Sequence, residues 1–187
     1  MKTKMNSQGH SSMFLALFLL VAAVLACSSG DETEKANKLG DEGNAAVAEG
    51  KKFFQEADDK KQKMLQTNVS ELAEARTLAK EAIAAYDKAE DKCKEAAKKY
   101  DEASKLKISD KFKEYLELKA KEYNKRAELV EASKGTPQAL LDSENRSSFI
   151  TRAQANNEKV AQLAKEAEDL AAQATKLEKD NPNMFKK

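Results

Sequence analysis

Few side chains in this 187-residue chain are of the kinds that commonly carry out enzyme chemistry. His10 is the only histidine, and Cys27 and Cys93 are the only cysteines. Nucleophiles assisted by histidine, histidine-ligated haem and the Glu-x-x-His pairs of di-iron bundles need histidines inside a folded domain, and His10 lies in an N-terminal segment of another character. We therefore expect a non-catalytic protein with no catalytic residue, no metal site and no cofactor.

Carboxylates and lysines are plentiful, but their pattern indicates solvated helix surfaces. Acidic pairs such as Asp58-Asp59 and Glu90-Asp91 alternate with lysines along the chain, as ion pairs on exposed helix faces do. An enzyme that uses carboxylates and lysines alone is the alternative, because perturbed groups of both types can transfer protons. The 33 basic and 32 acidic residues nearly cancel, which argues against nucleic acid as a partner. No glycine-rich phosphate loop is present, and we predict no small-molecule substrate.

Cys93 has two interpretations. It falls on an apolar stripe among alanines and tyrosines, where a small buried residue is expected. Alternatively it is a redox-active or disulfide-forming thiol, whose pKa Lys92 and Lys94 would lower if the thiol were exposed. The stripe favours a core residue.

The N-terminal segment has the pattern of an export signal. Lys2 and Lys4 precede residues 13–26 (MFLALFLLVAAVLA), a run of 14 residues without a polar side chain. A helix needs about 20 apolar residues to cross the hydrocarbon core. A run of 14 residues is therefore more consistent with a signal that is cleaved off than with a permanent transmembrane helix. Residues 1–26 are therefore predicted to be a signal peptide.

The end of this run, Val24-Leu25-Ala26-Cys27, followed by Ser28 and Ser29, resembles the lipobox of bacterial lipoproteins. The resemblance implies that the Cys27 thiol receives a diacylglyceryl group, that signal peptidase II cuts before Cys27, and that the new amino group is acylated, for example with palmitate. Two or more acyl chains anchor a protein stably, whereas one anchors it only marginally. The alternative is an ordinary cleaved signal followed by an incidental cysteine.

The same resemblance suggests a location. Serine rather than aspartate after the cysteine is similar to the outer-membrane sorting pattern of enteric bacteria, so we expect a place in the bacterial envelope, on the outer membrane facing the periplasm. The inner membrane and the cell surface are alternatives. The C-terminal Lys187 resembles the last residue of the murein lipoprotein, which is joined to peptidoglycan. Structural tethering of outer membrane to peptidoglycan through Lys187 is therefore an alternative function.

The remainder of the chain reads as long helices. Ala, Glu, Lys, Leu and Arg make up 103 of the 187 residues. In one apolar stripe, successive members lie three or four residues apart; it consists of Leu72, Ala75, Ala79, Ala82, Tyr86, Ala89, Cys93, Ala96, Tyr100 and Ala103. A second consists of Phe149, Ala153, Asn156, Val160, Leu163, Ala167, Leu170, Ala174 and Leu177. Two less regular helices are expected over residues 39–64, where we expect Gly43 and Gly50 to weaken the helix, and over residues 108–130.

Breaks between these helices are predicted at residues 66–70, 104–109 and 134–137. Ser109 is a candidate N-cap, and in the last break Gly135 suits a C-cap, Thr136 an N-cap and Pro137 the first helical position. Asn181 and Pro182 should stop the last helix.

The fold class expected is all-α, an antiparallel helical bundle of about four long helices with coiled-coil seams. The expected divisions are residues 1–26 as signal peptide, 27–31 as lipidated cysteine and tether, 32–180 as the bundle and 181–187 as a tail. Alanine-rich seams bury little area, so we expect modest stability, with a protein partner or self-association through helical faces. Asn156 is expected to specify register or to lie at a wet edge.

Overall fold

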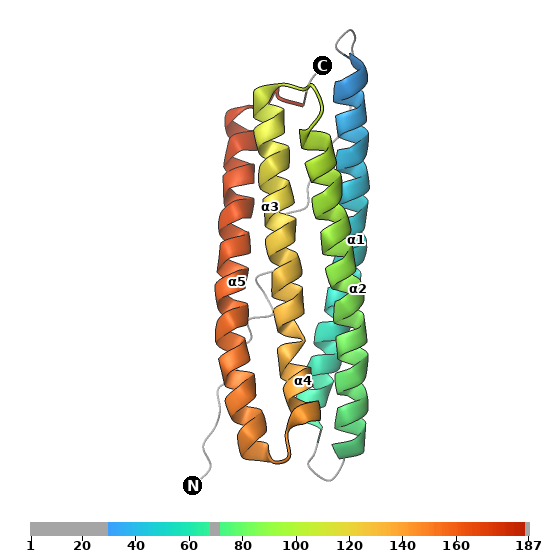
Figure 1. Cartoon of the computed structure of the whole chain (residues 1–187), viewed down its shortest axis with the longest axis vertical. Coiled ribbons are helices and arrows are strands. Elements are labelled where there is room, and N and C mark those ends of the chain that lie inside the picture. Colours follow the sequence, from blue (N-terminus) through green and yellow to red (C-terminus); the bar gives the residue numbers. More distant parts are fainter. Residues whose placement is uncertain (1–29, 68–71, 186–187) are drawn as a thin grey trace.

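The computed structural model describes residues 30–67 and 72–185, and every regular element in these two ranges is a helix. The predicted all-α antiparallel bundle is confirmed. Figure 1 shows the long helices running alternately up and down, with the short helix near the end where the chain turns into the last long helix. The helices are α1 (Gly30–Gln66), α2 (Leu72–Ser104), α3 (Asp110–Ser133), α4 (Gly135–Asp142) and α5 (Arg146–Asp180).

The long helices pack in chain order. Within the described residues, the extensive interhelical contacts join α1 to α2, α2 to α3 and α3 to α5, while α4 lies against α2 and α5. Helices α1 and α5 share no such extensive contact and lie at opposite edges of the arrangement (Figure 1). The bundle is therefore best described as a row of antiparallel helices whose central members, α2 and α3, have neighbours on two sides.

The seam between α1 and α2 is built from small residues at seven-residue spacing. On α2, the buried members are Ala75, Ala82, Ala89, Ala96 and Ala103. On α1, the corresponding row consists of Ala36, Gly43, Gly50 and Ala57, all of them buried. A heptad repeat keeps one face of each helix against its partner, and small side chains let the two backbones approach closely.

The two glycines on α1 have a packing role that the sequence did not reveal. A Cβ atom at Gly43 would lie 3.0 Å from Cζ of Tyr100, and one at Gly50 would lie 3.1 Å from Cβ of Lys92. Gly40, by contrast, has open space where its Cβ would be. The expectation that Gly43 and Gly50 merely weaken α1 was incomplete, because the side chains of α2 occupy the space that larger residues would need.

One helix cap confirms a predicted boundary, and a second one opens α5. The hydroxyl of Ser109 accepts a hydrogen bond from the Phe112 amide at the start of α3. The side chain of Asn145 accepts one from the Ser148 amide at the start of α5. Helix α5 ends at Asp180, directly before the predicted Asn181-Pro182 stop.

The α3–α4 junction differs from the expectation. Lys134 alone separates the two helices and is itself right-handed helical, so Gly135 is no C-cap and Pro137 is the third residue of α4 instead of the first. Proline is tolerated there because first-turn amides need no intrahelical partner. A Cβ at Gly135 would meet the side-chain amide of Asn156 on α5, which would have to shift to make room. Asn156 also donates a hydrogen bond to the Thr136 hydroxyl at 3.2 Å, which fixes α4 against α5.

One end of the bundle, which we call the Phe185 end, contains the start of α1, the α2–α3 connection and the C-terminal tail. Leu39, Leu106 and Phe185 pack there against one core cluster. The Phe185 ring meets the rings of Phe112 and Tyr115 edge to face, with centroids 5.3 and 5.1 Å apart. The opposite end of the bundle contains the C-terminal end of α1, the start of α2 and helix α4 (Figure 1).

Candidate functional site

Two of the residues singled out from the sequence, Cys27 and Lys187, lie outside the described residues. The structure places their neighbours: α1 begins at Gly30, so only Ser28 and Ser29 separate Cys27 from the first helix. Of the tether expected over residues 27–31, residues 30 and 31 belong to α1.

Cys93 is a free cysteine on α2 that packs beside the cluster of Ala85, Tyr86 and Ala89. Burial raises the pKa of the Cys93 thiol to about 11, while the neighbouring Arg126 opposes this shift and Glu122 adds to it. A thiol with so high a pKa is almost entirely protonated at neutral pH and is a poor nucleophile. This environment agrees with the interpretation of Cys93 as a core residue.

A buried ion cluster on α3 was missed by the sequence analysis. The side chain of Glu122 is only 2% exposed, and its two carboxylate oxygens lie 2.7 Å from Nζ of Lys119 and 2.7 Å from Nε of Arg126. Both cations are themselves mostly covered, at 17% and 24% exposure. A buried carboxylate is stabilised when its charge is paired and its oxygens accept hydrogen bonds, and both conditions are met here.

Two tyrosines complete this cluster. The rings of Tyr100 on α2 and Tyr123 on α3 stack with centroids 5.6 Å apart, and Nζ of Lys119 lies 4.8 Å from the centroid of Tyr123. The Tyr100 hydroxyl donates a hydrogen bond of 2.7 Å to Oδ1 of Asn44 on α1. Burial is the main cause that raises the pKa of both tyrosines, so both phenols stay protonated. The cluster thus links α1, α2 and α3 through polar contacts.

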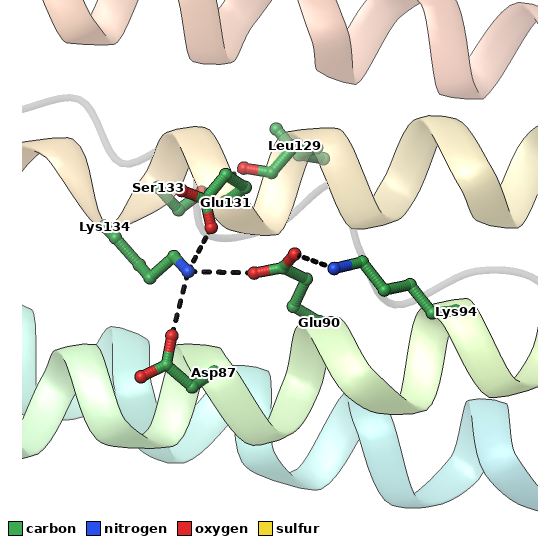
Figure 2. Close-up of polar contacts among 7 residues, drawn as sticks. All are labelled: Asp87, Glu90, Lys94, Leu129, Glu131, Ser133 and Lys134. Carbon is green, nitrogen blue, oxygen red and sulfur yellow. Dashed lines mark hydrogen bonds and ion pairs between the residues drawn. The ribbon is translucent and has the colours of Figure 1, made fainter.

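A second polar cluster joins α2 to the α3–α4 junction. Figure 2 shows Lys134 extending from the end of α3 toward Asp87 and Glu90 on α2. Its ammonium lies 2.8 Å from each of those carboxylates and also contacts Glu131, while Glu90 is paired with Lys94 at 2.5 Å.

The ionisation of this second cluster follows from its contacts. Burial opposes a charge on Glu90, but hydrogen bonds from Lys134 and Lys94 outweigh it and lower the pKa of Glu90 to about 2. Burial likewise disfavours the charge on Lys134, yet its bonds to Asp87, Glu131 and Glu90 raise the pKa of Lys134 above its usual value. Both groups are therefore held in their charged forms across the neutral range.

Neither cluster has the arrangement of a catalytic centre. Each charged group in them is already paired within the chain. The pKa of Glu90 is lowered and that of Lys134 is raised, both away from neutrality, whereas general acids and bases work best near the operating pH. No group of three potential metal ligands gathers within the part of the chain that the structure describes. The arrangement can hold helices in register, which is a structural role.

Two further acidic residues form ion pairs on the outer parts of the helices. Asp58 pairs with Lys61 on α1 at 2.5 Å, and Glu166 on α5 pairs with Lys125 on α3 at 3.1 Å. None of the helices described over residues 30–67 and 72–185 combines the length and apolar composition that crossing a bilayer requires.

Comparison with known proteins finds no protein-family model, curated protein or solved structure that matches this chain. The class that the structure itself defines is the all-α helical bundle.

Proposed function

We propose that this chain is a lipoprotein of the bacterial cell envelope, anchored by acyl chains on Cys27, whose helical bundle is a non-catalytic interaction or scaffold domain. The observation that carries the proposal is the apolar run of residues 13–26, which ends in Val24-Leu25-Ala26 directly before Cys27 and a polar stretch. Two or more acyl chains would anchor such a domain stably, at about 0.8 kcal/mol for each buried methylene.

The bundle supports a binding role more readily than a catalytic one. The charged groups of its two polar clusters are paired with one another, and its alanine stripe on α2 is buried within the chain at 0–5% exposure. A partner would therefore use surfaces other than this stripe. We expect that partner to be another protein or a second copy of this chain.

The exposed apolar side chains indicate where such a partner would dock. Among the described residues, the large hydrophobic side chains with high exposure are Leu65 (47%), Leu72 (46%) and Ile150 (41%). They belong to the end of α1, the start of α2 and the start of α5, so all three lie at the end of the bundle opposite Phe185. In a lipid-anchored protein this end would point away from the membrane and be accessible.

The anchor is tested by metabolic labelling. We expect the full-length protein, expressed in a bacterium that processes lipoproteins, to incorporate an alkyne-tagged palmitate, and the Cys27→Ala variant to incorporate none. A Cys93→Ala variant is the matched control, because that cysteine is half-buried on α2, packed against a core cluster, and should not affect labelling. A wild-type protein without label would contradict the proposal.

The alternative of a tether to peptidoglycan through Lys187 has a geometric consequence. The last described residue, Phe185, packs at the same end of the bundle as the start of α1. A bond to the cell wall at Lys187 would then form near the anchored end and not at the far end of the helices. If muramidase digestion left the apparent mass of the protein unchanged, this alternative would fail.

A further inference from the structure

We infer that the Phe185 end of the bundle rests on the lipid headgroups, so that the bundle stands end-on on the membrane. This inference rests on the proposed lipid anchor and adds to it a second, non-covalent contact with the lipid surface. It assigns that contact to the α2–α3 connection and the tail residue Phe185.

The position of the anchor brings this end to the membrane. Gly30 is three residues after Cys27, and a fully extended chain spans at most about 3.6 Å per residue, so the start of α1 lies within about 11 Å of the acylated residue. The α2–α3 connection is held beside the first turn of α1, because the Lys107 amide donates a hydrogen bond to the Glu32 carboxylate. Both segments must therefore lie close to the lipid.

The side chains at this end suit a headgroup layer. Leu106, Ile108 and Phe185 are only partly buried and extend the core cluster outward to the surface. The side chains of Lys107 and Lys113 at this end are exposed. Aromatic rings and lysines with apolar neighbours are typical of membrane–water interfaces, where the ring or stem is buried and the polar tip contacts the headgroups.

The charge at this end is otherwise balanced. Lys105 is paired with Asp101 at 2.5 Å, and Lys111 with Glu114 at 2.8 Å. Asp110 is exposed in the first turn of α3, where the helix dipole favours its negative charge. The surface therefore fits a zwitterionic phospholipid layer and does not depend on anionic lipid.

The opposite arrangement, in which the bundle lies flat, would press charged helix faces onto the lipid. The large exposed hydrophobic side chains that could compensate, Leu65, Leu72 and Ile150, are all at the far end. Helix α2 has 33 residues and is therefore about 50 Å long, so an end-on bundle holds those side chains about that far from the headgroups.

The test compares two labelled positions on the lipidated protein. In a Cys93→Ala background, whose Cys27 thiol is blocked by its thioether, a fluorophore is placed on Lys107→Cys or, as the matched control, on Gln66→Cys at the far end of α1. Both native side chains are exposed. The proteins are reconstituted in phosphatidylcholine vesicles that contain a lipid with a nitroxide quencher on its headgroup.

We expect a several-fold larger loss of fluorescence at position 107 than at position 66. Equal loss at both positions would show a flat orientation and overturn the inference, as would the absence of loss at both positions in protein that still floats with the vesicles. Protein that carries no lipid on Cys27 and does not float would overturn the proposed anchor itself, and the flotation assay distinguishes this failure from the other two.

Discussion

At the scale of single residues, Glu122 is the side chain whose position the sequence did not reveal. It lies in the helix predicted over residues 108–130, and its neighbours Lys119 and Arg126 stand at the spacing of ordinary surface ion pairs. Many other Lys-Glu combinations in this chain have the same spacing and are exposed. Glu122 differs from them because the tertiary packing covers the side of α3 on which it lies.

The buried ion cluster predicts a strong effect of a conservative substitution. Glu122→Gln keeps the size of the side chain but leaves Lys119 and Arg126 without their shared counter-charge, so we expect a loss of about 2–3 kcal/mol in the free energy of unfolding. The control, Glu128→Gln, removes a carboxylate that is 56% exposed and paired with Lys125, and should cost less than about 1 kcal/mol. Urea unfolding of both variants measures the difference, and equal effects would show that the Glu122 cluster contributes no more than a surface pair.

Glu90 predicts a particular dependence of stability on pH. Its pKa is lowered in the folded chain from 4.5 to about 2, so the stability that its pairing contributes is present above pH 4.5 and is lost as the pH falls toward 2. Glu90→Gln should therefore have a lower Tm at neutral pH, and its Tm should decrease less than that of the wild type on acidification. Thermal unfolding followed by circular dichroism from pH 7 to pH 3 measures this, with Glu114→Gln, an exposed pair with Lys111, as control. Parallel wild-type and Glu90→Gln curves would contradict it.

At the scale of helices, the sequence predicted most of the architecture. The stripes of α2 and α5 and the Ser109 cap identified long helices, because periodic apolar positions and cap residues act locally. The short helix α4 was less predictable, since the glycine and proline of the junction resemble a turn, whereas in the structure both belong to α4. Leu72 was expected in the α2 stripe but is 46% exposed and is the first residue of the helix.

The glycines of α1 provide a test of the α1–α2 seam. Gly43→Ala places a methyl group 3.0 Å from the Tyr100 ring, which is 2% exposed and held by its bond to Asn44, so we expect a net destabilisation of about 1–3 kcal/mol. Gly40→Ala, on the same helix with open space around the new methyl, should stabilise by about 1 kcal/mol through its helix propensity. Chemical unfolding of both variants checks the opposite signs. Stabilisation by Gly43→Ala would show that the seam is looser than the structure indicates.

At the scale of the whole molecule, the row of helices gives the domain two chemically different ends. The Phe185 end combines the start of α1 with an aromatic cluster, and the far end carries the exposed Leu65, Leu72 and Ile150. An anchor on Cys27 would assign one end to the membrane and the other to a partner. The sequence alone could not separate these ends, because they are assembled from segments that lie far apart along the chain.

The most direct test of the proposed lipid anchor on Cys27 is the intact mass of the protein extracted from bacterial membranes. We expect a chain that begins at Cys27 and is heavier than the unmodified polypeptide by a diacylglyceryl group and one further acyl chain. The same protein with Cys27→Ala should not show these additions. A wild-type mass equal to that of the unmodified full-length chain, or of a chain cleaved elsewhere without lipid, would contradict the account.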